Sequence, residues 1–302
     1  MIPNAIGRAL LPLLLGAGTL HAQPRGDSPT PTSAALPGRV VEVAAGEFFF
    51  QAPDSIPAGL TTFRLRQIGL VHQRVIAGGA ALDSLAMHPD DQTRGLHMLW
   101  LVRLDSGKTA ADLYRAAQAG ERTTGWTRPL GGPGFALPPG TSNATLILEP
   151  GDYVIICYVG SAREDRKRYH FLNGMFRALT VLPNAKPVAA MPAPDVVIRV
   201  SETGVLQYSA PIVAGRRVLR IENAGARSYE FSVRRVAPGR TSAEALAWRP
   251  NDSPRTPPPF EPIGGLSDVP PGGSLVTTIT FHPGDHFVAA GRQPFTVLPA
   301  RP

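Results

Sequence analysis

The sequence predicts an all-β protein made of two tandem Greek-key β-sandwiches, each with one short helix. Three observations predict this fold class: short runs of alternating apolar and polar residues, an internal repeat, and Pro-rich segments that bracket the copies of the repeat. The chain has 302 residues, of which 43% are hydrophobic and 18% are charged, which is enough apolar material for two modest cores.

The N-terminus has the pattern of a secretory signal. One cation, Arg8, precedes the apolar run Ala9–Leu15, and small residues lead to Ala22, after which we expect cleavage. The run is shorter than the ~20 residues that cross a bilayer, and no second run of this kind follows. We therefore expect residues 1–22 to be a signal peptide, no transmembrane segment, and a periplasmic or secreted protein.

Composition predicts the domain boundaries. Residues 23–38 are rich in Pro, Ser, Thr and Gly, which is typical of a flexible tether, and residues 184–194 have the composition of a linker. These segments predict a first domain over residues 39–183 and a second over residues 195–302.

Six runs in the first domain predict strands of a small antiparallel sandwich. Each alternates apolar and polar residues and is bounded by Pro or Gly. The runs are Val40–Val43, Phe63–Leu65, Leu99–Leu104, Thr145–Leu148, Tyr153–Cys157 and Ala178–Leu182.

A helix is predicted in each copy by a capping box, in which a hydroxyl and a carboxylate satisfy free amides of the first turn. The first copy has Thr109 with Asp112, and the second has Thr241 with Glu244. Each pair follows a matching stretch of chain, so the helix is part of the repeat.

The two copies differ in length in two places. The first copy is longer between Gly69 and Gly107 than the second is between Gly225 and Gly239, and it is longer again after Gly151. The extra chain brings in His72, His88, Cys157 and His170, and it leads to Met175. Extra chain and residue types that bind metals therefore occur together.

These residues resemble the cupredoxins, or blue copper proteins. A strand that follows Pro150–Tyr153 ends in Cys157, His170 and Met175 come later, and His97 opens a much earlier strand. The resemblance implies one type 1 copper ion in the first domain, held by His97, Cys157, His170 and Met175. A thiolate, two imidazoles and a weak thioether suit copper in both of its redox states.

The resemblance also offers His72 as the alternative to His97, because the ligand histidine of the cupredoxins follows an Asn-x-Gly type turn by a few residues, and here His72 follows Gly69 by three. We prefer His97, since the strand that it opens has a counterpart in the second copy. In that copy Tyr229 takes the place of His97, and Ala290 takes the place of Cys157. We therefore expect the second copy to hold no metal.

Three functions fit the sequence. The first is an exported mononuclear copper protein that carries single electrons or copper. The second is a metal-free binding module of the cell envelope, in which Cys157 and Met175 fill the core as hydrophobic side chains. The third, a copper enzyme of the multicopper oxidase type, is disfavoured, because Cys157 is flanked by Ile156 and Tyr158 rather than by His, and no His-x-His pair occurs. We therefore expect no enzyme.

The formal charge of +7 does not by itself indicate a nucleic-acid partner. Lys and Arg are scattered along the sequence, without a basic helix or an aromatic-interleaved basic patch. The run Arg163–Arg168 could dock an acidic redox partner or could be a solvated face. The sequence leaves the oligomeric state open.

Overall fold

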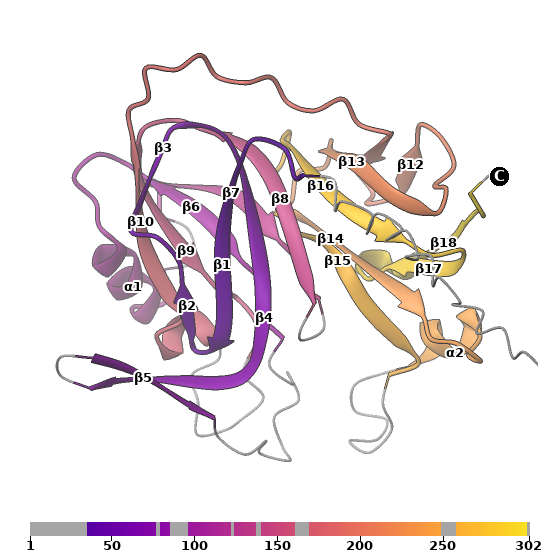
Figure 1. Cartoon of the computed structure of the whole chain (residues 1–302), viewed down its shortest axis with the longest axis horizontal. Coiled ribbons are helices and arrows are strands. Elements are labelled where there is room, and N and C mark those ends of the chain that lie inside the picture. Colours follow the sequence, from indigo (N-terminus) through magenta and orange to yellow (C-terminus); the bar gives the residue numbers. More distant parts are fainter. Residues whose placement is uncertain are drawn as a thin grey trace, which may run out of the picture. The chain divides into compact units, whose positions relative to one another are not determined.

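The computed structural model describes residues 35–76, 79–84, 96–121, 124–136, 140–160, 169–248 and 258–300. The predicted signal peptide, tether residues 23–34, His88 and the run Arg163–Arg168 lie outside the described residues. Residues 36–302 form one compact unit, and its described part is built mainly of strands (Figure 1).

The first copy of the repeat contains ten of the labelled strands, one α-helix and one 3-10 helix. In chain order they are β1 (Arg39–Glu47), β2 (Phe49–Gln51), β3 (Ser55–Pro57), β4 (Gly59–Ile76), β5 (Gly79–Ser84), β6 (Trp100–Leu104), α1 (Ala110–Gln118), β7 (Thr127–Pro133), β8 (Thr141–Leu148), β9 (Gly151–Ile156), η1 (His170–Asn173) and β10 (Phe176–Leu182).

The second copy repeats this order in shorter form. Its elements are β11 (Val196–Val200), β12 (Leu206–Tyr208), β13 (Gly215–Asn223), β14 (Tyr229–Val236), α2 (Ser242–Ala247), β15 (Phe260–Val269), β16 (Ser274–Phe281), β17 (Gly284–Val288), η2 (Ala290–Arg292) and β18 (Gln293–Val297).

Two sheets run through both copies. One has the order β12-β11-β13-β16-β8-β4-β1-β2, with β5 paired to β4, and the other has the order β18-β17-β14-β15-β7-β6-β9-β10-β3. The copies join where β16 pairs with β8 and where β15 pairs with β7. The prediction of an all-β fold of two tandem sandwiches with one short helix each is confirmed (Figure 1).

Period-two alternation explains which side of each strand enters the core. In β13, Leu219 and Ile221 are buried, whereas Arg220 and Glu222 lie on the outer face. One hydrophobic cluster contains inward residues of both copies, such as Leu101 of the first and Phe231 of the second.

Both predicted capping boxes are present. Thr109 accepts a hydrogen bond from the backbone amide of Asp112, whose carboxylate accepts one from the amide of Thr109. Thr241 and Glu244 make the same reciprocal pair at the start of α2. The two hydroxyl–carboxylate pairs therefore fix where the helices begin.

The extra chain after Gly69 begins as a β-hairpin and not as a loop. Strand β4 continues through it to Ile76 and pairs with β5 as a hairpin, which places Val71 opposite Ser84. The period-two signal in Phe63–Leu65 therefore belongs to a much longer strand.

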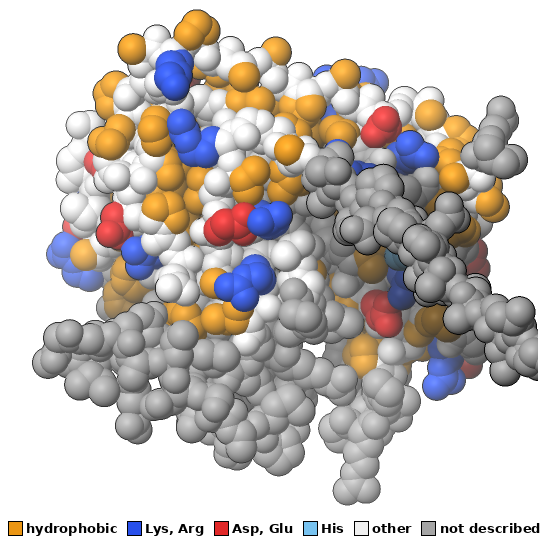
Figure 2. All heavy atoms as spheres, viewed as in Figure 1, with side chains coloured by type: hydrophobic (Ala, Val, Ile, Leu, Met, Phe, Trp, Pro, Cys, Tyr) orange, Lys and Arg blue, Asp and Glu red, His pale blue; other side chains and the backbone are white. Residues whose placement is uncertain are grey.

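The charged side chains on the face in Figure 2 are spread among other residue types rather than gathered in one basic patch. Ion pairs join some of the protein's charged side chains, such as Arg64 of β4 with Glu42 of β1, and Arg199 with Glu222 at 3.1 Å. None of the helices in the described part of the chain is long and apolar enough to cross a membrane.

Candidate metal centre

Strand order brings His97 and Cys157 to the same end of the first sandwich. Strands β6 and β9 are antiparallel neighbours, with Trp100 opposite Ile156. Cys157 comes directly after the last residue of β9, and His97 lies three residues before the first residue of β6. Antiparallel pairing therefore places the two side chains at one pole although they are far apart in sequence.

Backbone hydrogen bonds fold the chain between Cys157 and Met175 back onto itself. The amide of Cys157 donates to the carbonyl of Met175 at 3.2 Å, and the amide of Phe171 donates to the carbonyl of Cys157 at 2.8 Å. The amide of Met175 donates to the carbonyl of His170 at 3.0 Å. Gly174 ends η1 with a φ of 99°, a conformation that favours glycine.

Two side chains that the sequence did not single out hold the ligand-bearing segments. The Gln67 side chain donates to the His97 carbonyl at 2.6 Å and accepts from the His97 amide at 3.3 Å. The Tyr114 hydroxyl of α1 donates to the carbonyl of Leu172 in η1 at 3.1 Å. The capping box predicts the helix from the sequence, but a bond from its tyrosine to a distant backbone carbonyl has no sequence signal.

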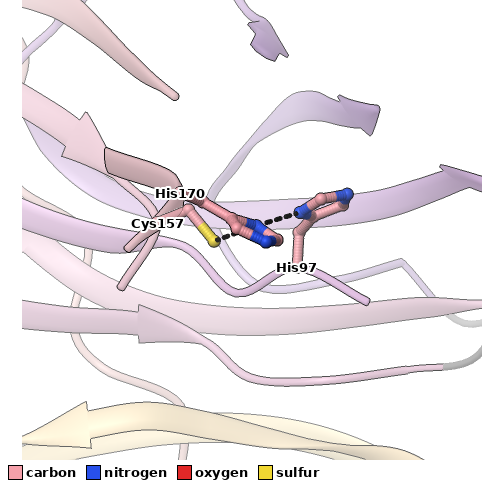
Figure 3. Close-up of side chains that lie close together, drawn as sticks. All are labelled: His97, Cys157 and His170. Atoms are coloured by element: carbon pink, nitrogen blue, oxygen red, sulfur yellow. Dashed lines mark hydrogen bonds between the residues drawn. The ribbon is translucent and has the colours of Figure 1, made fainter. Parts of the chain in front are cut away.

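The side chains of His97, Cys157 and His170 converge (Figure 3). One potential ligand atom from each lies within 4.8 Å of the others. Nδ1 of His97 is 3.1 Å from Nδ1 of His170, and the Cys157 sulfur is 3.8 Å from the same nitrogen of His170. Ligand atoms that share one ion at ~2.0–2.3 Å lie up to about 4.6 Å apart, so these separations suit a shared ion.

The cluster is closed to solvent. His97 and Cys157 are 0% exposed and His170 is 1% exposed. Met175 is also fully buried, in the same hydrophobic cluster as Cys157. The structure thus brings three of the four predicted ligands into one group and bonds the backbone of Met175 to two of them.

Burial and the neighbouring His170 ring lower the pKa of His97 well below the ordinary 6.5. His97 is therefore neutral at neutral pH, which is the form that binds metals. The three groups that converge are two nitrogens and one sulfur without a carboxylate, a donor set that suits copper or zinc and not calcium or magnesium.

Phe48 covers one side of His170. Its ring meets the His170 ring edge-on, with centroids 5.0 Å apart and an interplanar angle of 78°. Phe48 has a φ of 60°, in the left-handed region that bulky residues rarely adopt. The turn between β1 and β2, with Phe48 in this conformation, places the ring against His170.

His72, the alternative ligand, lies on β4, where its backbone is opposite Glu47 of β1 and Asp83 of β5. Its side chain is not among the described ones, so the choice between His97 and His72 as ligand stays a prediction.

The equivalent place in the second copy is filled by other hydrogen bonds. The Tyr229 hydroxyl donates to the Ala290 carbonyl at 3.2 Å and accepts from the Gln293 side chain at 3.1 Å. Register supports the equivalence of Tyr229 and His97, because Leu101 pairs with Ile155 as Val233 pairs with Val288. Among the described residues, the His97 group is the one whose ligand atoms converge.

Comparisons with known proteins give structural matches only, since no family model and no curated protein matches the chain. Reduced auracyanin from Roseiflexus castenholzii is 16% identical, with a TM-score of 0.27, over 48% of this chain and 98% of its own. Auracyanin B is 22% identical, with a TM-score of 0.25, over 49% and 92%. A multicopper oxidase is 11% identical, with a TM-score of 0.22, over 88% and 92%. Because these TM-scores are low, the description of the fold rests on the strand order of this chain and not on the matches.

Proposed function

We propose that the chain is an exported, mononuclear type 1 copper protein that carries single electrons or copper. One observation supports this most directly. Two imidazole Nδ1 atoms and a thiol sulfur, from three separate segments, meet in a buried group at one pole of the first sandwich. When bound, copper would supply one-electron chemistry, with its Cu(II) state stabilised by the thiolate of Cys157.

The protein's own contribution is to fix the positions of the donor atoms and to keep them away from water. His97 is fixed through Gln67, and the His170 segment is fixed through Tyr114 and the bonds between Cys157 and Met175. A rigid site changes little between redox states, which favours fast electron transfer. A carrier fits better than an oxidase, because the sequence has no His-x-His pair for further copper ions.

A metal-free binding module is the second candidate, and one distance favours it. The 3.1 Å separation of the His97 and His170 Nδ1 atoms is also that of a hydrogen bond, so one ring can donate to the other without an ion. The two functions therefore differ in what occupies the space between these nitrogens.

Copper loading of the purified protein separates the two candidates. We expect one equivalent of Cu(II) to give an intense visible thiolate-to-copper absorption band that Cys157→Ser abolishes. His286→Ala, at a buried histidine of the second copy, is the matched control and should retain the band. A titration that gives no band, or a band that survives in Cys157→Ser, would overturn the copper proposal.

A further inference from the structure

A serine of the second copy reaches the segment that carries His97. Ser267 lies on β15 and is buried, with 2% of its surface exposed. Its hydroxyl donates to the carbonyl of Leu99 at 2.7 Å and lies 3.2 Å from the carbonyl of Gly132. Leu99 is two residues after His97, so this bond links the second sandwich to the segment that carries a candidate ligand.

The reach is possible because β7, which lies between β15 and β6, carries glycines at this point. A Cβ on Gly132 would come within 2.3 Å of the Leu99 carbonyl oxygen, and one on Gly131 would come within 1.8 Å of the Asp268 carbonyl oxygen. Side chains are thus excluded at both positions. The three backbones approach closely enough for one hydroxyl to cross from β15 to Leu99.

The segment from His97 to Leu99 precedes the ladder of β6, which begins at Trp100. Hydrogen bonds from other segments hold it. Gln67 holds both backbone groups of His97, and the Leu99 amide donates to the carbonyl of Pro133 at 3.0 Å. Ser267 then satisfies the Leu99 carbonyl from the second copy. The His97 end of the segment is therefore fixed from within the first sandwich, and the Leu99 end is fixed both by the first sandwich, through Pro133, and by the second, through Ser267.

We infer that the second sandwich, which lacks the metal-binding residues, acts as a brace for the metal centre and that Ser267 is the positioning residue through which it acts on His97. The inference rests on the proposed copper function. Groups behind a ligand set its orientation, and a small displacement of an imidazole changes the metal's coordination. The brace thus gives the second copy a role that needs no ligand of its own.

Thr277 offers a matched control. It is a buried residue of β16 whose hydroxyl donates to the carbonyl of Asn143 in β8, also at 2.7 Å. Like Ser267, it bonds the second copy to the backbone of the first. Its acceptor, however, is not on a ligand-bearing segment. Ser267→Ala and Thr277→Val therefore each remove one buried hydroxyl that donates across the copies, but only the first touches the His97 segment.

The first measurement uses the full chain without metal and so does not depend on copper binding. In Ser267→Ala we expect hydrogen exchange of the Leu99 amide to rise roughly tenfold, as for the loss of one buried hydrogen bond, while strands of the second copy keep their protection. Thr277→Val should leave the Leu99 amide at the wild-type rate. Unchanged exchange at Leu99 in Ser267→Ala, or a uniform rise over the whole chain, would overturn the brace.

The second measurement uses the copper-loaded full chain. Ser267→Ala should shift the thiolate-to-copper band and the copper hyperfine splitting in the electron paramagnetic resonance spectrum, whereas Thr277→Val should keep both at wild-type values. Faster exchange at Leu99 with an unchanged copper spectrum would overturn the link from Ser267 to the metal. A wild-type chain that gives no copper band would instead overturn the proposed function, and the exchange result would still decide whether the brace exists.

Discussion

The Nδ1 atoms of His97 and His170 face each other at 3.1 Å inside the first sandwich. The two rings are tilted by 53°, with centroids 5.1 Å apart. In the view of Figure 3 the His170 ring lies between the Cys157 sulfur and the His97 ring, and the sulfur is 3.8 Å from Nδ1 of His170. The pair can thus share a proton or share an ion, and predictions about the site follow from that choice.

Replacing either histidine should open the metal centre. In copper-loaded His97→Ala we expect the visible band to be lost or strongly shifted, because only one imidazole nitrogen and the thiolate remain from the converging group. Added imidazole should restore much of the band by entering the vacated space. His170→Ala should behave in the same way. A His97→Ala protein with an unaltered band would point to His72 as the ligand.

Met175 is expected to tune the site rather than to build it. Met175→Leu keeps a buried apolar side chain of similar volume, so the loss of unfolding free energy should stay below about 1.5 kcal/mol. The thiolate-to-copper band should persist. The reduction potential should rise, because removal of a weak donor disfavours Cu(II) more than Cu(I). A potential equal to that of the wild type, measured by redox titration, would remove Met175 from the ligand set.

Phe48→Gly separates backbone strain from ring packing. Glycine adopts the φ of 60° without strain, a gain of roughly 1–3 kcal/mol, while loss of the packed ring acts in the opposite direction. We therefore expect a small net change in stability but faster binding of azide to the copper-loaded protein, since the ring covers His170. Arg292→Gly, at the other described non-glycine residue with a positive φ, should not change azide binding.

Asp268 should make the protein more stable at mildly acidic pH. Burial raises its pKa to about 6, against an ordinary 3.8, although a hydrogen bond with Ser228 acts the other way. Its Oδ2 has no hydrogen-bond partner among the described residues, and Glu230, whose pKa is also raised by burial, lies near enough to interact. Between pH 3.8 and about 6, Asp268 keeps a proton in the folded chain that it releases in the unfolded chain. This contribution is present at low pH and is lost as pH rises through about 6.

The corresponding variant is Asp268→Asn, compared with the wild type by urea unfolding at pH 5 and pH 7.5. We expect the variant to gain about 1–3 kcal/mol over the wild type at pH 7.5 and about half as much at pH 5. Asp285→Asn should show the opposite sign, because hydrogen bonds from Ser242 and Thr296 lower the pKa of Asp285. Equal differences at the two pH values would contradict the assignment to Asp268.

The sequence predicted the elements whose signals are local. The capping boxes at Thr109 and Thr241 identify the helices because the bonding groups are only three residues apart. The alignment of His97 with Tyr229, counted from matching glycines, agrees with the observed strand register. Repeats and helix caps can be recognised from residue spacing alone, so the helix starts and the alignment of the two copies were predictable.

Features that depend on distant segments were not predicted. The sequence predicts two separate sandwiches, whereas in the structure β7 of the first copy pairs with β15 of the second, with Gly132 opposite Asp268. The glycine pair Gly131–Gly132 recurs in the second copy as Gly264–Gly265, but its role in close backbone approach emerges only when β15 lies beside it. Gln67 and Phe48 contact candidate ligands, and Ser267 contacts the segment of one. All three act from distant parts of the chain, and no residue spacing in the sequence indicates such contacts.

Continuous sheets also change how many strand edges the chain offers to its neighbours. An unpaired edge is a template on which another molecule can add a strand, and long exposed edges promote aggregation. Here β8 and β16, and likewise β7 and β15, cover each other's edges. The outermost strands β2, β3 and β12 are only three residues long, so each offers very few free backbone groups, whereas β18 at the fourth end has five residues. Joining the copies edge to edge thus covers strand edges that two separate sandwiches would expose.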